Sequence, residues 1–237
     1  MRRRNFDPDQ SEWMDRANPD ARELEEDLHN LAAINRHFGG AAIWRFFLSR
    51  WIRPGGTYRL LDLATGGGDA PRLMVDFARS VGANVTVTAI DAQPATLDFA
   101  RRASRNYPEI EFREGDVRAP DFPGDAPYDF AFFSLALHHF SESDAVVVLC
   151  QLRQLGRRGV MVADLARGFI CSAGAWLVTA TLYRAPMTRH DARMSASRAF
   201  SFEEMRQLAE AAGWKDFLHQ RFSFGRQAIW HEAANAV

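Results

Sequence analysis

The chain has 237 residues, 47% of them hydrophobic and 25% charged, which is the balance of an ordinary globular protein and excludes disorder for most of its length. Its 29 basic and 30 acidic residues give a formal net charge of −1, so we expect no global attraction to nucleic acid or to an anionic membrane. The basic start MRRR leads into NFDPDQSEW rather than an apolar core, so we expect no secretory signal peptide and a cytoplasmic location.

Residues 1–56 are predicted to form a tail and a helical cap. Residues 1 to about 18 are polar and contain Pro8, so we expect them to be mobile or loosely docked. From Ala21 to His37 the apolar residues recur at three- and four-residue steps, which predicts an amphipathic helix, and residues 41–52 predict a second one.

Residues 57–237 then alternate between strand-like and helical patterns. The strand-like runs are nearly continuous in apolar residues, which is typical of a sheet covered on both faces. Strand, helix and strand at this spacing predict right-handed βαβ units and therefore a Rossmann-like, mostly parallel α/β sheet. The predicted strands are 58–64, 84–90, 109–115, 128–135 and 159–165, and the predicted helices between them are 69–81, 94–106 and 141–155.

An insertion is predicted at about 167–200, after the fifth of these strands. Its first part, 169–183, has no charged side chain but is shorter than the ~20 residues needed to span a bilayer. We expect a buried helix or an apolar lid there, with lipid contact as the alternative. The second part, 187–200, is polar and arginine-rich and is expected to be a loop. Ser201 and Glu204 then have the spacing of a capping box, and two final strand-like runs predict a hairpin.

A glycine-rich turn, DLATGGGDAP, separates the first strand from its helix. Ligands of open α/β sheets bind outside the carboxyl ends of the strands, and glycines let a ligand approach the backbone closely. A dinucleotide fingerprint needs glycine or alanine where this chain has Pro71, so the match to that motif fails. Asp91, at the end of the second strand, can accept hydrogen bonds from ribose hydroxyls, and Asp116, after the third, can accept from an adenine amino group.

These segments resemble the successive motifs of class I S-adenosylmethionine-dependent methyltransferases. LLDLATGGGDAP, VTAIDAQPATLDFAR, FREGDVRAPDFP and YDFAFFSLALHHF occur in the family's order, over about residues 58–165. The resemblance implies a doubly wound, seven-stranded sheet with an antiparallel last strand, and S-adenosylmethionine as the cofactor. The leading helices, with LHNLAAINRHFGG, look more like the small-molecule branch, whose members modify polyketides, phenolics and quinones.

Carried over position by position, the resemblance implies a cofactor site along three strand ends. The glycines would hold the methionine half, Asp91 the ribose, and Asp116 and Val117 the adenine. Ala64 stands where the family's loop has its first glycine, and we expect the loop to survive because alanine is small. Arg36, together with Asn35 at the end of the cap helix, is a further candidate for the cofactor carboxylate, with surface pairing as the alternative. The full predicted set is Arg36, Ala64, Thr65, Gly66, Gly67, Gly68, Asp91, Ala92, Asp116, Val117, Ser134 and Leu135, the last two lining the floor beneath the sulfonium.

Transfer of a sulfonium methyl group is an in-line displacement, so catalysis depends largely on positioning and on the exclusion of water. A base is needed only where the nucleophile must lose a proton, as with a phenol or an activated carbon. His139, after the fourth strand, and His190, beside Asp191, are the candidate bases, and each has a structural role as its alternative. No third ligand stands at a recognisable spacing from a histidine pair, so no metal site is predicted.

The expected reaction is methyl transfer from S-adenosylmethionine to an oxygen or carbon of a hydrophobic small molecule, such as a phenolic, polyketide or quinone-like compound. A non-catalytic adenosylmethionine-binding protein is the alternative. An NAD(P)-dependent oxidoreductase is disfavoured by Pro71 and by the lack of a Tyr-x-x-x-Lys pair, since Lys215 is the only lysine. We expect no nucleic-acid partner and no stable membrane insertion, and a homodimer is possible.

Overall fold

The structure is a computed structural model that describes residues 4–119 and 128–233. Residues 1–3, 120–127 and 234–237 lie outside the described ranges, and they include the first three residues of the predicted tail and the last four of the motif FREGDVRAPDFP. Within the described ranges no helix has both the length and the apolar character needed to cross a membrane.

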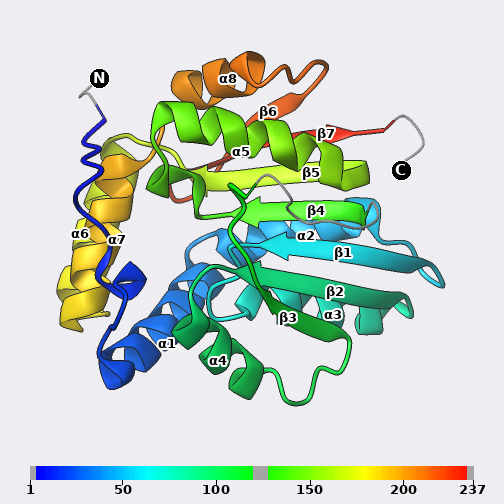
Figure 1. Cartoon of the computed structure of the whole chain (residues 1–237), viewed down its shortest axis with the longest axis horizontal. Coiled ribbons are helices and arrows are strands. Elements are labelled where there is room, and N and C mark those ends of the chain that lie inside the picture. The colour runs from blue at the N-terminus through cyan, green and yellow to red at the C-terminus, as the bar shows by residue number, and fades with distance from the viewer. Residues whose placement is uncertain (1–3, 120–127, 234–237) are drawn as a thin grey trace.

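Seven strands form one sheet in the order β3-β2-β1-β4-β5-β7-β6 (Figure 1). The first five pair in parallel, β7 pairs antiparallel with β5, and β6 pairs antiparallel with β7, which confirms the predicted doubly wound sheet with an antiparallel last strand. The strands are β1 (Thr57–Leu63), β2 (Asn84–Asp91), β3 (Ile110–Glu114), β4 (Tyr128–Ser134), β5 (Gly156–Leu165), β6 (Leu218–Phe222) and β7 (Arg226–Glu232).

The helices expected between the strands are present, and so is the capping box of Ser201 and Glu204 at the start of α8. The described helices are η1 (Trp13–Asp15), α1 (Ala21–His37), α2 (Gly40–Trp51), α3 (Asp69–Val81), α4 (Pro94–Ala103), η2 (Leu137–His139), α5 (Glu142–Leu155), α6 (Phe169–Thr181), α7 (Pro186–Arg198) and α8 (Phe202–Ala211).

Helix α7 corrects the prediction of a polar loop at 187–200. The sequence there shows no apolar periodicity, because the side chains that α7 buries include the polar Thr188, Asp191 and Arg198. Each of these finds a polar partner in the fold, so a polar sequence can form a buried helix face. Pro186 begins the helix, where a missing N–H is tolerated.

Alternate residues of β1 face two separate hydrophobic layers. Leu60 packs with α2 and α3 on one face, and Leu61 packs with α5 and α8 on the other. On the first face Trp51 of α2 is fully buried and stacks on Phe130 of β4, with ring centroids 4.7 Å apart. Full burial of one such large apolar side chain contributes about 1.5–3 kcal/mol, so α2, although it precedes the first strand, helps to hold the sheet.

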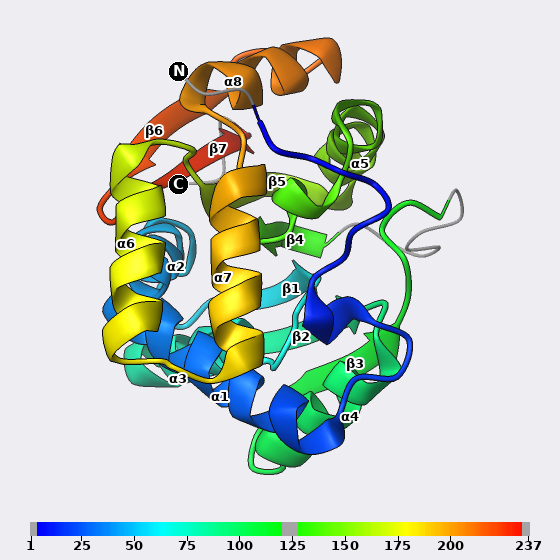
Figure 2. The ribbon, with the colours of Figure 1, turned by 90° about the vertical axis from the view of Figure 1, so that its left-hand side faces the viewer.

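Helices α6 and α7 lie side by side across the carboxyl ends of the parallel strands (Figure 2). The prediction of a buried helix at 169–183 is wrong, because within α6 only Cys171 and Thr179 are buried. The apolar lid, which the sequence offered beside the buried helix, fits the position of α6 across the carboxyl ends of the strands (Figure 2).

The turn from β1 to α3 contains three residues in the left-handed region of backbone space. Their φ angles are 53° at Ala64, 54° at Gly66 and 74° at Gly68. Glycine adopts this conformation at no steric cost, whereas a residue with a Cβ is strained there by about 1–2 kcal/mol. The loop therefore keeps its conformation with Ala64 in place of its first glycine, as expected, and Ala64 is strained there.

We expect Ala64→Gly to raise the free energy of unfolding by about 1 kcal/mol, because the substitution removes the strain of a left-handed alanine. Chemical denaturation of the cofactor-free protein measures the change. Ala173→Gly, at an exposed position inside α6, is the matched control and should lower stability by about 1 kcal/mol. Equal destabilisation by both substitutions would contradict the assignment of strain to Ala64.

Candidate active site

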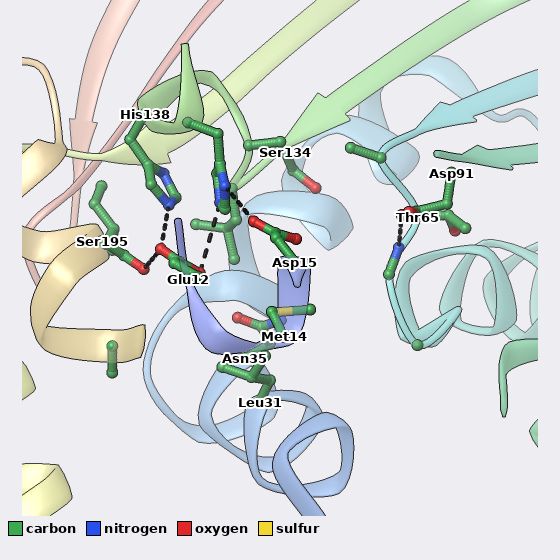
Figure 3. Close-up of a pocket in the computed structure, with 18 of the residues that line it drawn as sticks. Glu12, Met14, Asp15, Leu31, Asn35, Thr65, Asp91, Ser134, His138 and Ser195 are labelled. Atoms are coloured by element: carbon green, nitrogen blue, oxygen red, sulfur yellow. Dashed lines mark hydrogen bonds and ion pairs between the residues drawn. The ribbon is translucent and has the colours of Figure 1, made fainter. Parts of the chain in front are cut away.

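A cavity of about 630 Å³ lies at the carboxyl ends of β1, β2 and β4. Residues of the glycine-rich turn and of the strand ends line one part of it, and residues of α1, α6 and α7 line another. The N-terminal segment, which we define as residues 4–17, crosses the same end of the sheet beside α7 and contributes Glu12, Met14 and Asp15 to the wall (Figures 2 and 3). The cavity is therefore built from both ends of the chain.

The glycine-rich turn is tied to the end of β2. Asp91 accepts a hydrogen bond from the Gly66 N–H at 2.8 Å through one carboxylate oxygen and from the Gln93 N–H at 3.0 Å through the other. A Cβ placed on Gly66 would meet nothing within 4 Å, so the open space beside this residue belongs to the cavity. The turn thus presents backbone to a ligand at the position where the sequence predicts the cofactor.

Three carboxyl groups surround this turn and line the cavity: that of Asp62 is buried, and those of Asp69 and Asp91 are half-buried. Burial raises the pKa of each, and Asp69 and Asp91 further raise the pKa of Asp62, to about 8, although Thr65 donates a hydrogen bond to Asp62 at 2.6 Å. Carboxylates held so close together in a buried site favour a positively charged ligand. Sequence reasoning assigned a role to Asp91 alone among them.

Most of the predicted cofactor residues line the cavity. They are Ala64, Thr65, Gly66, Gly67, Asp91, Ala92, Asp116, Val117, Ser134 and Leu135. Ser134 accepts a hydrogen bond from the Trp44 indole N–H at 3.2 Å, so α2 fixes the floor of the cavity. Asp116 is paired with the Arg118 guanidinium, which lowers the pKa of its carboxyl group, and Gly68 caps α3 without lining the cavity.

The predicted carboxylate partner, Arg36, is exposed and does not line the cavity. A different arginine, Arg226 at the start of β7, is buried and does line it. Arg226 donates to the Phe38 carbonyl at 2.7 Å and to the Asn35 side chain at 3.3 Å. Burial lowers the pKa of Arg226 to about 10, so it remains protonated at neutral pH and supplies a buried positive charge. Only the pairing of β7 with β5 brings it there, so local sequence gives no sign of it.

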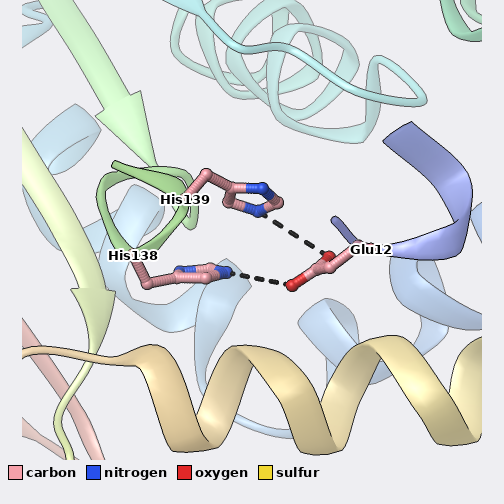
Figure 4. Close-up of side chains that lie close together, drawn as sticks. All are labelled: Glu12, His138 and His139. Atoms are coloured by element: carbon pink, nitrogen blue, oxygen red, sulfur yellow. Dashed lines mark ion pairs between the residues drawn. The ribbon is translucent and has the colours of Figure 1, made fainter. Parts of the chain in front are cut away.

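Two histidines meet three acidic side chains at the other side of the cavity (Figure 3). His138 Nδ1 lies 2.7 Å from Asp164, and His139 Nδ1 lies 2.9 Å from Asp15. The remaining ring nitrogens both face Glu12, at 3.5 Å from His138 and 3.7 Å from His139 (Figure 4). Glu12 is only 3% exposed and also accepts a hydrogen bond from the Ser195 hydroxyl at 2.6 Å.

This arrangement requires a proton or another cation between each imidazole and Glu12. Once each Nδ1–H is donated to a carboxylate, the lone pair on each Nε2 would face the carboxylate of Glu12 unless a cation or a proton lies between them. Burial alone would lower the pKa of His138, but Asp164 and Glu12 outweigh it and raise the pKa to about 10. Burial alone would raise the pKa of Glu12, but the two histidines lower it to about 2.

The ligating atoms of Glu12, His138 and His139 also lie within 4.8 Å of one another, and a divalent metal such as zinc accepts such a donor set. The sequence predicted no metal site because no third ligand follows the histidine pair at a recognisable spacing. The third donor, Glu12, comes instead from the N-terminal segment, and no local pattern reveals it.

His190 does not line the cavity. Its ring stacks on Trp13, with centroids 4.4 Å apart, and its Nδ1 lies 2.7 Å from Asp191. The contacts of His190 therefore hold the N-terminal segment against α7, and of the two candidate bases only His139 lies where a ligand of the cavity can reach it.

The prediction of a mobile or loosely docked tail is wrong for residues 4–17. Asp191, which is 1% exposed, accepts the backbone N–H groups of Trp13 and Met14 at 2.8 and 3.0 Å. The Arg4 guanidinium donates to the carbonyls of His138 and Phe140. The polar composition misled the prediction because these contacts join charged side chains to backbone groups, and they leave no apolar periodicity in the sequence.

The strand order, with a glycine-rich turn after β1 and an acid after β2, is that of the class I methyltransferase fold. Residues 60–159 match a family model described as "Methyltransferase domain". The match covers less than half of the chain, and the solved structures of similar fold include methyltransferases bound to SAM and to SAH.

Among curated proteins, a 2-phytyl-1,4-naphtoquinone methyltransferase of Thermosynechococcus vestitus is 37% identical over 93 residues, which are 39% of this chain and 39% of that one. Human N-acetylserotonin methyltransferase, solved in complex with SAM, has a TM-score of 0.64 at 17% identity, covering 90% of this chain and 56% of that one. A family 2 O-methyltransferase from Planctomyces limnophilus, solved with apigenin, has a TM-score of 0.62 at 16% identity, covering 92% and 63%. The match thus spans well under half of the curated relative.

We expect Asp191→Ala to release the N-terminal segment, because two backbone N–H groups and His190 lose their acceptor at a loss of about 1–3 kcal/mol per unsatisfied group. Tryptic cleavage after Arg16, followed by mass spectrometry, should become several-fold faster while the domain itself stays intact. Asp98→Ala, which removes an exposed acid on α4, is the matched control. An unchanged cleavage rate in Asp191→Ala would show that other contacts hold the segment.

Proposed function

We propose that the protein transfers a methyl group from S-adenosylmethionine to an oxygen or carbon of a hydrophobic small molecule. The observation that carries this proposal is the division of one cavity into a charged part around the glycine-rich turn and an apolar part beneath α6. S-adenosylmethionine supplies an electrophilic methyl group on a sulfonium, and it also carries an ammonium and a carboxylate. The charged part has groups of the complementary signs.

The cofactor half of the proposal assigns one role to each charged group. Asp62 and Asp69 are positioned to balance the positive charges of the cofactor, and Arg226 takes its carboxylate in place of Arg36. Asp91 holds the ribose hydroxyls while its bond to the Gly66 N–H keeps the turn in shape. The open space beside Gly66 fits close approach of the methionine half.

The part of the cavity beneath α6, where the acceptor would bind, is apolar, which supports a hydrophobic substrate. Cys171, Ala175 and Val178 of α6 line it from one side, and Leu28 and Leu31 of α1 line it from another. The names of two similar proteins, one acting on a naphthoquinone and one solved with the flavone apigenin, agree with an aromatic acceptor. Such a molecule buries its surface against these side chains, which orients it for displacement and excludes water.

Where the acceptor must lose a proton, His139 and Glu12 are the groups beside it. The bond that forms joins the acceptor oxygen or carbon to the methyl carbon, the methyl–sulfur bond breaks, and its electron pair stays on sulfur. His139 Nε2 takes the acceptor's proton after its own proton has gone to solvent, so the step restores the imidazolium that Asp15 and Glu12 stabilise. His138, held by Asp164, positions Glu12 from the other side.

Calorimetric titration tests the cofactor assignment. S-adenosylmethionine and its demethylated product should bind saturably, whereas NADH and NADPH should give no heat of binding, because Pro71 occupies the place of the third glycine of a dinucleotide site. Asp91→Ala should weaken S-adenosylmethionine binding by about tenfold or more, since a buried hydrogen-bond acceptor to a ligand is worth about 1.5–3 kcal/mol. Binding of a nicotinamide cofactor alone would overturn the proposal.

The pH dependence of the same titration checks the role of Asp62. Its folded pKa of about 8 means that the carboxyl group is largely protonated at pH 7 and becomes an anion as the pH rises through 8. A positively charged ligand binds the anion better, so affinity for S-adenosylmethionine should rise between about pH 7 and pH 9. Asp62→Asn is the matched control, and in it this rise should disappear.

Turnover tests the catalytic assignment, with methyl-labelled S-adenosylmethionine and with apigenin and a reduced naphthoquinone as acceptors. His139→Gln should lower kcat by about a hundredfold or more, the usual loss when a general base is removed. His231→Gln, at an exposed position of β7 that does not line the cavity, is the matched control and should leave kcat within about twofold. If the wild-type protein binds the cofactor but methylates no acceptor of such a panel, the non-catalytic alternative holds.

A further inference from the structure

Helix α6 exposes an apolar face to the outside of the molecule. Two of its outward side chains, Trp176 and Leu177, are 59% and 57% exposed, and Phe169 and Leu182, at its two ends, are 87% and 64% exposed. Scattered apolar side chains are normal on a protein surface, but several large ones on one short helix mark an interaction site. We call this set, Phe169, Trp176, Leu177 and Leu182, the α6 face.

The opposite side of the same helix lines the cavity. Cys171, Gly174, Ala175, Val178 and Thr179 belong to the cavity wall. Ile170 belongs to both sides, since it lines the cavity and is 69% exposed. One helix therefore separates the apolar part of the cavity from whatever covers the α6 face. An apolar molecule that enters the cavity from that side has to pass only helix α6.

The chain around α6 carries positive charge without negative charge. Residues 165–190 contain Arg167, Arg184 and Arg189 and no aspartate or glutamate. Arg167 pairs with Glu204, whereas Arg184 and Arg189 are exposed at the turn from α6 to α7. This local asymmetry stands out in a chain whose formal net charge is −1. An apolar helix face flanked by exposed arginines has the composition of an interfacial membrane helix.

We propose that the α6 face, with Arg184 and Arg189, docks reversibly on the surface of an anionic lipid bilayer. The helix has 13 residues and so is about 20 Å long, too short to span a bilayer, so it would lie in the plane of the interface. The apolar side chains enter the boundary between headgroups and acyl chains, and the arginines pair with lipid phosphates. In combination with the proposed function, the bilayer is then the phase from which the hydrophobic acceptor reaches the cavity.

A second copy of the chain is a less suitable partner for this face. In a twofold-symmetric contact the same patch faces itself, so the arginines at one end of α6 would be brought into a shared interface. No acidic side chain of residues 165–190 is available to pair with them there. An anionic surface offers the opposite charge along the whole helix.

Vesicle flotation tests the docking without any catalytic step. The full chain is mixed with vesicles of equal parts phosphatidylglycerol and phosphatidylcholine, or of phosphatidylcholine alone, and floated on a density gradient. We expect the protein to float with the anionic vesicles, and to be released when the salt rises from about 0.1 M to about 1 M, where charges are screened over a few ångströms.

Two pairs of substitutions separate the apolar and the ionic contributions. Trp176→Gln with Leu177→Gln, and separately Arg184→Gln with Arg189→Gln, should each lower the vesicle partition coefficient by about tenfold or more. Val147→Gln, on exposed α5 surface, is the control for the first pair, and Arg101→Gln with Arg102→Gln on α4 is the control for the second. Both controls should float like the wild type.

The proposal is overturned if the wild type stays in the aqueous fractions with anionic vesicles, or if the double variants float as well as their controls. It is also overturned if sedimentation velocity finds a wild-type dimer that Trp176→Gln with Leu177→Gln dissociates, because the face then belongs to a second copy. Flotation and turnover of a soluble acceptor are measured separately, so loss of turnover with intact flotation would count against the proposed function alone.

Discussion

The buried carboxylate of Glu12 is the contact on which the architecture of the cavity depends. A carboxylate with 3% exposure is tolerated only where cations and donors surround it, and two imidazoles and the Ser195 hydroxyl do so here. Glu12 comes from the N-terminal segment, the imidazoles come from η2 after β4, and Ser195 comes from α7. One ionised side chain thereby links three distant stretches of the chain, and the cavity closes only when they meet.

The same reasoning applies at the glycine-rich turn, where the negative charge of the carboxyl groups is not fully balanced by the protein. The buried Asp62 and the half-buried Asp69 and Asp91 lie close together, and the fold provides mainly hydrogen-bond donors for them rather than cations. The charge of Glu12 is balanced by imidazoles of the protein itself, whereas the carboxyl groups at the turn are left to be balanced by a ligand. This difference explains why one cluster holds the fold together and the other is suited to bind a charged cofactor.

Sequence patterns predict the parts of this protein whose contacts are local or periodic. For that reason the sequence predicted the strands, the glycine-rich turn, the position of Asp91 and the capping box of Ser201. It did not predict Arg226 at the cavity, because only the antiparallel pairing of β7 with β5 brings this residue there. The docked tail and helix α7 were missed for a related reason: charged and polar side chains bond to backbone groups there, and such contacts have no period in the sequence.

The two walls over the cavity differ in how firmly they are held, and this decides where an acceptor can enter. The N-terminal segment is fixed by buried, charge-assisted contacts through Glu12, Asp191 and Arg4, each of which is expensive to break without a replacement partner. Helix α6 buries only Cys171 and Thr179 and keeps most of its large side chains outside. Segments with few buried contacts open at lower free energy than the rest of a fold. We therefore expect the cavity to open past α6 while the N-terminal segment stays docked, so that the catalytic cluster remains assembled as an apolar molecule enters.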